Sequence, residues 1–141
     1  MKRRAAVGWG LGIVVALWLV GVVSPQEAEP PPEATITELM QAMVIPASTK
    51  LFDVPRNVPQ DDSGWAEVRN SAVLLAESGT LLIRDGRAKD SDVWAATSRA
   101  LAEAGEAALK AARARDPEAI GEAGNLLIDA CERCHEKHWI R

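Results

Sequence analysis

The apolar residues from Thr35 to the C-terminus recur at intervals of three and four, which places them on one face of an α-helix. No stretch alternates apolar and polar residues in the manner of a half-buried strand. Aromatic residues make up only 4% of the chain, while alanine is abundant. Strands favour β-branched and aromatic residues, so this composition favours closely packed helices. A length of 141 residues suits one all-α domain.

The first helix is delimited by a start signal and an internal breaker. Thr35 and Glu38 have the spacing of a capping box, in which each side chain accepts a hydrogen bond from the other residue's backbone N–H. Pro46 lacks an N–H and crowds the preceding turn, so we expect a kink or break there.

Three further helices follow. The second begins near Ser63, and its connection to the third starts at Thr80. The third is alanine-rich and capped by Asp90 or by the serine after it. The fourth begins with Asp116 as N-cap and Pro117 in the first helical position. Four such helices with short connections predict an antiparallel four-helix bundle over residues 35–141.

The N-terminal segment precedes this domain. Three basic residues in the first four positions are followed by an unbroken apolar run from Ala5 to Val23. This pattern predicts, for residues 1–24, either a cleaved signal peptide or a retained membrane anchor. Residues 25–34 contain three consecutive prolines and predict an extended spacer. Both alternatives export the domain, so we expect a periplasmic protein, soluble or tethered to the inner membrane.

The charge balance limits the classes of partner. The chain carries 16 basic and 20 acidic residues, a net charge of −4. Nucleic-acid binding depends on clustered lysine and arginine, so a nucleic-acid partner is not expected. An acidic surface suits a basic partner protein.

Residues 131–139, "CERCHEKHW", contain both cysteines and both histidines of the chain. They continue the apolar stripe of the fourth helix, which runs through Ile120, Ala123, Leu127, Cys131, Cys134 and His138. Thiols three residues apart share a helix face, and Cys-x-x-Cys-His is the attachment signature of c-type haem. We therefore predict one covalent haem c, held by Cys131 and Cys134, with His135 as an iron ligand.

Three alternatives use the same residues. Zinc accepts thiolate and imidazole ligands, although Cys131, Cys134, His135 and His138 on one side of a helix make a poor tetrahedron. A thioredoxin-type redox site needs a strand before its helix, and none is predicted. A disulfide, or a pair of structural thiols, is the third alternative.

With these residues the chain resembles the class II cytochromes c, which comprise the cytochrome c prime family and its low-spin, methionine-ligated relatives. The resemblance covers residues 34–141 and rests on "CERCHEKH", with weaker matches at "TITELMQAM" and "LLIRDGRAKDSDVW". It implies thioether bonds at Cys131 and Cys134, and His135 as the proximal iron ligand. It also implies Met40 as the distal ligand, with Met43 as the second choice.

The chain departs from the family pattern at several positions. Ile36 stands where the family often has an arginine near a haem propionate. Arg84 or Arg87 could take that role, or could be solvated loop charges. His138 replaces an aromatic residue and is expected at the rim of the site. Two tryptophans, Trp65 and Trp94, are expected as core anchors that could also touch the porphyrin edge.

These features predict a periplasmic electron carrier that docks on redox partner proteins, and not an enzyme, because no general base or nucleophile is legible. The alternative is a five-coordinate haem protein that binds nitric oxide or carbon monoxide in an apolar pocket formed by Ile36, Leu39, Met40 and Met43. A third reading is a zinc-stapled structural bundle. Members of the family often pair as homodimers, although no exposed stripe in this sequence requires a dimer.

Overall fold

A computed structural model of the chain describes residues 34–84, 86–90 and 92–139. Within these residues the fold is all-helical. Its elements are α1 (Ile36–Leu39), η1, a π-helical segment (Met40–Val44), α2 (Ile45–Asp53), α3 (Asp62–Ile83), α4 (Val93–Ala114) and α5 (Pro117–His138). The predicted signal or anchor over residues 1–24, and most of the predicted spacer, lie outside the described residues. None of the described helices combines the length and hydropathy needed to cross a bilayer.

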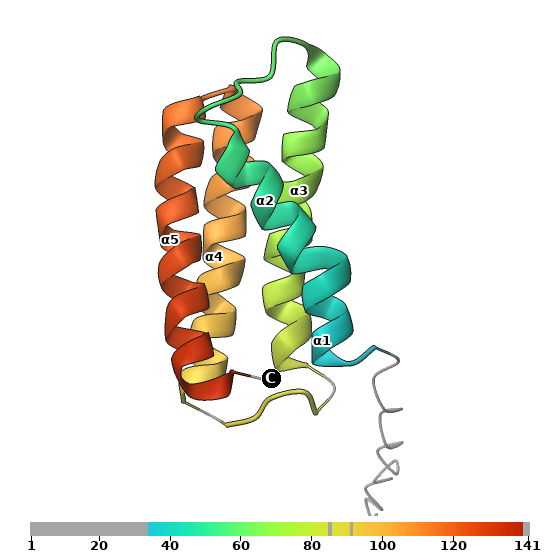
Figure 1. Ribbon diagram of the computed structural model, residues 1–141, viewed down its shortest axis with the longest axis vertical. Helices are drawn as coiled ribbons and strands as arrows, with labels where there is room; N and C mark the ends of the chain where they lie inside the picture. The colour runs from blue at the N-terminus through green and yellow to red at the C-terminus, as the bar shows by residue number, and fades with distance from the viewer. Residues whose placement is uncertain (1–33, 85, 91, 140–141) are drawn as a thin grey trace, which may run out of the picture.

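The predicted all-α fold of four helical segments is confirmed for the described residues, and the contacts between these segments fit the predicted bundle (Figure 1). α3, α4 and α5 run antiparallel to their neighbours in sequence, and α4 packs against both of the others. α1, η1 and α2 form one continuous fourth helical segment that leans across the bundle. Its upper part, α2, contacts α3 and α5, whereas α1 and the C-terminal end of α5 lie apart in Figure 1.

The helix starts follow the capping residues of the sequence. Thr35 and Glu38 form the predicted capping box, with the Thr35 N–H donating to Glu38 Oε2 at 2.8 Å. Asp61 caps α3, and its Oδ1 accepts the Gly64 N–H at 2.8 Å. Asp116 caps α5 as predicted, with Pro117 in the first turn. Each cap satisfies N–H groups that have no partner within the helix.

The end of α3 differs from the prediction. The helix continues to Ile83, through residues 80–83 that were assigned to the connection. Leu82 is buried in this last turn and its carbonyl accepts the indole N–H of Trp94 at 2.7 Å. This tertiary contact extends the helix beyond the point where the local sequence suggested an end.

Pro46 does not break the first helical segment, which runs on from η1 into α2. The hydrogen-bond pattern changes one turn earlier, in η1, where the Ile45 N–H donates to Met40 O, five residues back. Pro46 has no N–H to donate to Ala42 O, four residues back, so a regular α-helical ladder is interrupted here in any case. The wider π-turn accommodates that gap, and Met40 is its first residue.

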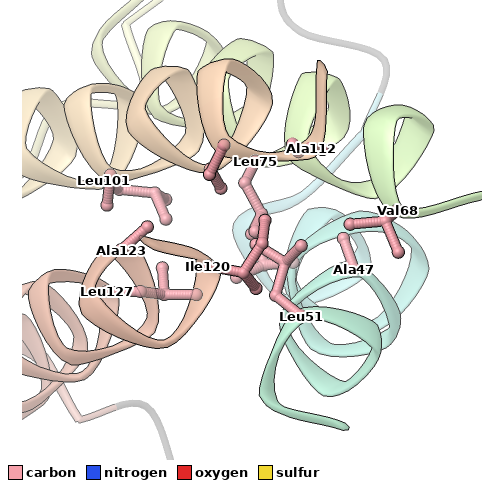
Figure 2. Packing of buried hydrophobic residues seen from close by; sticks show 14 of the residues in the cluster. Ala47, Leu51, Val68, Leu75, Leu101, Ala112, Ile120, Ala123 and Leu127 are labelled. Carbon is pink, nitrogen blue, oxygen red and sulfur yellow. The ribbon is translucent and has the colours of Figure 1, made fainter. Parts of the chain in front are cut away.

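The core combines leucines and alanines from all four helical segments (Figure 2). α3 and α4 approach most closely where glycines face the other helix. A Cβ on Gly105 would lie 2.3 Å from Ala76 N, and one on Gly79 would lie 2.5 Å from Ser98 O. Any side chain at these positions would therefore push the two helices apart.

Replacing each of two glycines with alanine, in separate variants, tests this packing between α3 and α4. Gly105→Ala should destabilise the fold by about 1–3 kcal/mol, because the new methyl group overlaps the α3 backbone. Gly121→Ala, where the nearest contact is Pro55 Cγ at 3.5 Å, should instead stabilise the fold by up to about 1 kcal/mol through helix propensity. Urea unfolding followed by circular dichroism measures the change in unfolding free energy of both variants. Changes of the same sign in the two variants would contradict this packing.

Candidate functional site

A cavity of about 280 Å³ opens between the first helical segment and the C-terminal half of α5. One wall comes from α1, η1 and the start of α2, and the other from the last three turns of α5. The floor is α4, through Trp94, Thr97, Ser98 and Leu101, with Leu82 of α3 beside it. The lining is mostly apolar, as is usual for sites that bind an organic cofactor.

The α5 wall carries the predicted cofactor-binding residues. Cys131, Cys134 and His135 all line the cavity and all are partly buried. Both thiols are free in the structure, so it contains no disulfide between them. Burial raises the pKa of the Cys131 thiol, and the neighbouring Cys134 and Glu132 raise it further. The two thiols and the imidazole are thus brought together on one side of the cavity.

The opposite wall distinguishes the two candidate methionines. Met40 lines the cavity, whereas Met43 packs against the core without lining it. Ile36 and Val44 flank Met40 on this wall, and Leu39, expected in the distal pocket, is buried in the core instead. Of the two methionines, the geometry therefore favours Met40 as the residue that faces a molecule in the cavity.

The floor contains a feature that sequence reasoning missed. Ser98 is buried, yet its Oγ has no hydrogen-bond partner among the described residues. Its neighbour Thr97 uses its hydroxyl on the carbonyls of Val93, at 2.7 Å, and Trp94, at 3.2 Å. The helical spacing of the buried residues along α4 places Ser98 in the interior. No pattern in the sequence shows that its hydroxyl lacks a hydrogen-bond partner among the described residues.

The two histidines have different surroundings. The His135 ring meets the exposed Trp139 ring edge-on, with centroids 5.0 Å apart. The His138 ring meets Trp94 edge-on at 5.2 Å, and its Nε2 lies 2.9 Å from Asp90 Oδ2. That close polar contact lacks standard hydrogen-bond geometry. His138 also lines the cavity, consistent with its predicted place at the rim.

Four further residues singled out in the sequence, two arginines and two tryptophans, can be located. Arg87 is buried and donates hydrogen bonds to backbone carbonyls, so it is not a solvated loop charge. Arg84 is exposed, and neither arginine lines the cavity. Trp65 and Trp94 are both buried as expected, but only Trp94 lines the cavity.

The donor set can be compared with the cofactors considered for it. A structural zinc ion needs four ligands in a tetrahedron. In the described part of the chain, no three histidine, cysteine or acidic side chains converge on a point that could hold a metal ion. A haem c needs two thiols on one helix face, an imidazole beside them and an apolar cleft. The residues lining the cavity fit that requirement, and Met40 adds a thioether on the opposite wall.

The last turn of α5 is joined to the start of α4 through one carboxylate. The pKa of Asp90 is lowered from 3.8 to about 2, chiefly by the hydrogen bond from the Trp94 N–H and further by Lys137. Because the folded-state pKa lies below the unfolded one, Asp90 stabilises the fold above about pH 4. This contribution is lost as the pH falls towards 2.

Asp90→Asn should therefore remove part of the acid sensitivity of the protein. Thermal unfolding at about pH 6 and about pH 2.5 measures it, since only the wild type titrates a carboxyl at this position between these values. We expect a smaller loss of melting temperature on acidification in Asp90→Asn than in the wild type. An equal loss in both proteins would contradict the contacts assigned to Asp90.

Comparisons of the chain with models of protein families, with curated proteins and with solved structures found no match. The resemblance to class II cytochromes c is therefore still a prediction. A function for the chain has to be argued from the residues of the cavity.

Proposed function

We propose that this chain is a c-type cytochrome that carries single electrons through one covalently attached haem. Cys131 and Cys134 would form the two thioether bonds, His135 would be the proximal iron ligand, and Met40 the distal ligand. The observation that carries the proposal is the composition of the cavity. It has two thiols and an imidazole on the α5 wall, a methionine on the facing wall, and a mostly apolar lining.

The placement of these residues supports the proposal better than the motif alone. Cys131 and Cys134 are three residues apart on a regular helix, so both thiols project from the same face. His135 follows directly and lines the same cavity. Haem attachment outside a helix-lined cleft would leave a large apolar surface exposed to water. Here Leu101 and Val44, both buried, provide apolar contact area on the floor and the facing wall.

The chain's own residues would set the chemistry. When bound, a haem supplies an iron atom that changes oxidation state by one electron. Imidazole on one side and thioether on the other leave no open position, and a methionine ligand raises the reduction potential. The apolar lining keeps water away from the site, which lowers the solvent reorganisation that accompanies a change of charge. This arrangement suits a carrier, and we do not propose an enzymatic reaction.

Electron exchange requires a place where a partner protein can approach. Trp139 is 63% exposed, lines the cavity and touches the His135 ring. Large exposed aromatic side chains are favoured contacts at protein interfaces. We propose that redox partners dock at this end of α5. The periplasmic location and the membrane anchor remain proposals from the sequence of residues 1–24.

The gas-binding alternative draws on one observation. Ile36 and Val44 flank Met40, so displacement of its thioether would leave an apolar wall facing the iron. Such a wall would admit small neutral molecules, including nitric oxide and carbon monoxide. The electron-carrier and gas-binding functions differ in whether Met40 occupies the distal position, and a single spectroscopic experiment distinguishes them.

The absorption spectrum of the exported protein, made together with haem-attachment machinery, tests the proposal. We expect sharp low-spin bands in the reduced protein that change little on addition of carbon monoxide, because Met40 already fills the distal position. Broad high-spin bands that shift with carbon monoxide would support the gas-binding alternative. A protein that carries no haem, and that contains stoichiometric zinc, would overturn both.

The methionine assignment is tested by a matched pair of variants. Met40→Ala should convert the low-spin spectrum to a high-spin one, because it removes the only methionine of the described residues that lines the cavity. Met43→Ala removes an equal side chain from the same π-helical segment and should leave the spectrum low-spin. Conversion by Met43→Ala alone would show that the ligand was assigned to the wrong methionine.

A further inference from the structure

The two walls of the cavity belong to segments that reach the same end of the bundle without packing closely against each other there. α1 begins and α5 ends at this end, as Figure 1 shows, and the connection between α3 and α4 passes there too. Three residues in or next to this connection contact the other elements. We call Arg87, Asp90 and Trp94 the clasp.

Arg87 joins the start of α1 to the end of α3. Its Nε and Nη2 lie 3.4 Å from Ala34 O, just before α1, and its Nη1 lies 3.3 Å from Leu81 O. The side chain is buried, so these backbone carbonyls receive a charged donor in a site with little water. Hydrogen bonds from charged groups are stronger than neutral ones. Arg87 therefore restrains the helical segment that carries Met40.

Asp90 joins the start of α4 to the end of α5. Its Oδ1 accepts the backbone N–H of Trp94 at 2.9 Å and that of Asp92 at 3.0 Å. Its Oδ2 lies 2.9 Å from His138 Nε2 and 3.2 Å from Lys137 Nζ. One carboxylate thus accepts a backbone N–H from the first turn of α4 and forms a salt bridge with Lys137 in the last turn of α5, the helix that carries His135.

Trp94 connects these two sets of contacts. Its indole N–H donates to Leu82 O in the last turn of α3, one residue after the carbonyl that Arg87 binds. Its ring packs edge-on against His138. Every helical segment that reaches this end of the bundle therefore contacts at least one residue of the clasp.

The clasp is needed because packing alone restrains this end weakly. The fully buried residues of α5 stop at Ala130, and from Cys131 to His138 each described residue is at least partly exposed. The α2 segment packs against α5, but farther from the cavity opening. The distance between the two walls near His135 therefore depends on contacts other than the core.

We propose that the clasp sets the separation between the wall that carries Met40 and the wall that carries His135. Asp90 is then a positioning residue, which acts on the shape of the cavity and on the placement of the iron ligands. This inference rests on the proposed function, in which the two residues bind one iron from opposite sides. It assigns to Asp90 a role beyond helix capping. Outer contacts of this kind commonly determine how firmly ligands hold a metal.

The test uses the full-length exported protein and separates capping from positioning. Asp90→Asn retains a side-chain oxygen that can accept the backbone N–H groups of Asp92 and Trp94, but it removes the anionic partner of Lys137. Asp116→Ala is the matched control, since it removes a cap of two backbone N–H groups from α5 at the far end of the bundle. Arg87→Met releases the opposite wall.

The rate of carbon monoxide binding to the reduced protein and the midpoint potential are the readouts. We expect Asp90→Asn and Arg87→Met to raise the rate about tenfold, the lower end of effects seen for outer contacts of metal ligands. Both should also lower the potential, because Met40, which would raise it as a ligand, would be held less firmly. Asp116→Ala should lower thermal stability with the rate and potential unchanged. If Asp90→Asn matches the wild type in both readouts, the positioning role is wrong.

A second measurement keeps the clasp testable if the proposed function fails. Should the wild type carry no haem, amide hydrogen exchange of that protein still reports the contacts. Asp90→Asn should then speed exchange at residues 134–138 more than Asp116→Ala does. Equal exchange in the two variants would overturn the clasp, whereas absence of haem by itself overturns only the proposed function.

Discussion

The close contact between α3 and α4 is the constraint on which the site depends. Gly79 brings the α3 backbone against Ser98 O, and Gly105 admits the backbone of Ala76. Because Ser98 belongs to the floor of the cavity, this contact fixes the floor against the centre of the bundle. Small residues at such contacts let the two helix backbones approach closely and pack densely. With the floor fixed in this way, the shape of the site depends on the positions of its two walls.

The two walls of the cavity come from different helical segments. Ala130 is the last buried residue of α5, and the final turns, which carry the two cysteines and His135, are partly exposed. The first helical segment leans away from this end of α5, and its π-turn begins at Met40. The lining of these walls is mostly apolar, which suits a flat, apolar cofactor joined to the two cysteines, and this is the physical reason for the proposed function.

Much of the fold could be predicted from local signals. The capping box at Thr35, the cap at Asp116 with Pro117, and the stripe that ends in Cys131 each depend on residues close in sequence. The extra turn of α3 could not be predicted, since it depends on Leu82 and on the indole N–H of Trp94, twelve residues away. The π-turn also escaped prediction, because Pro46 specifies only that a hydrogen bond is missing and not how the helix adapts.

The residues of the candidate site could likewise be predicted only in part. Spacing identifies Cys131, Cys134 and His135 as one group, and the structure places all three at one cavity. The preference for Met40 over Met43 rests on a family resemblance in the sequence, and in the structure Met40 lines the cavity whereas Met43 does not. The contact of Asp90 with His138 joins residues 48 positions apart, and no local pattern indicates it. The sequence also does not reveal that Arg87 donates hydrogen bonds to backbone carbonyls.

Covalent attachment of haem is the central claim, and the intact mass of the denatured exported protein measures it most directly. Denaturation releases any cofactor held only by ligands or packing, so a retained mass increase of one haem requires bonds to the chain. We expect that increase in the wild type and its loss when both Cys131 and Cys134 are replaced by alanine. A wild-type mass equal to that of the bare chain would contradict covalent attachment, and a haem adduct that survives in the double variant would contradict attachment through these cysteines.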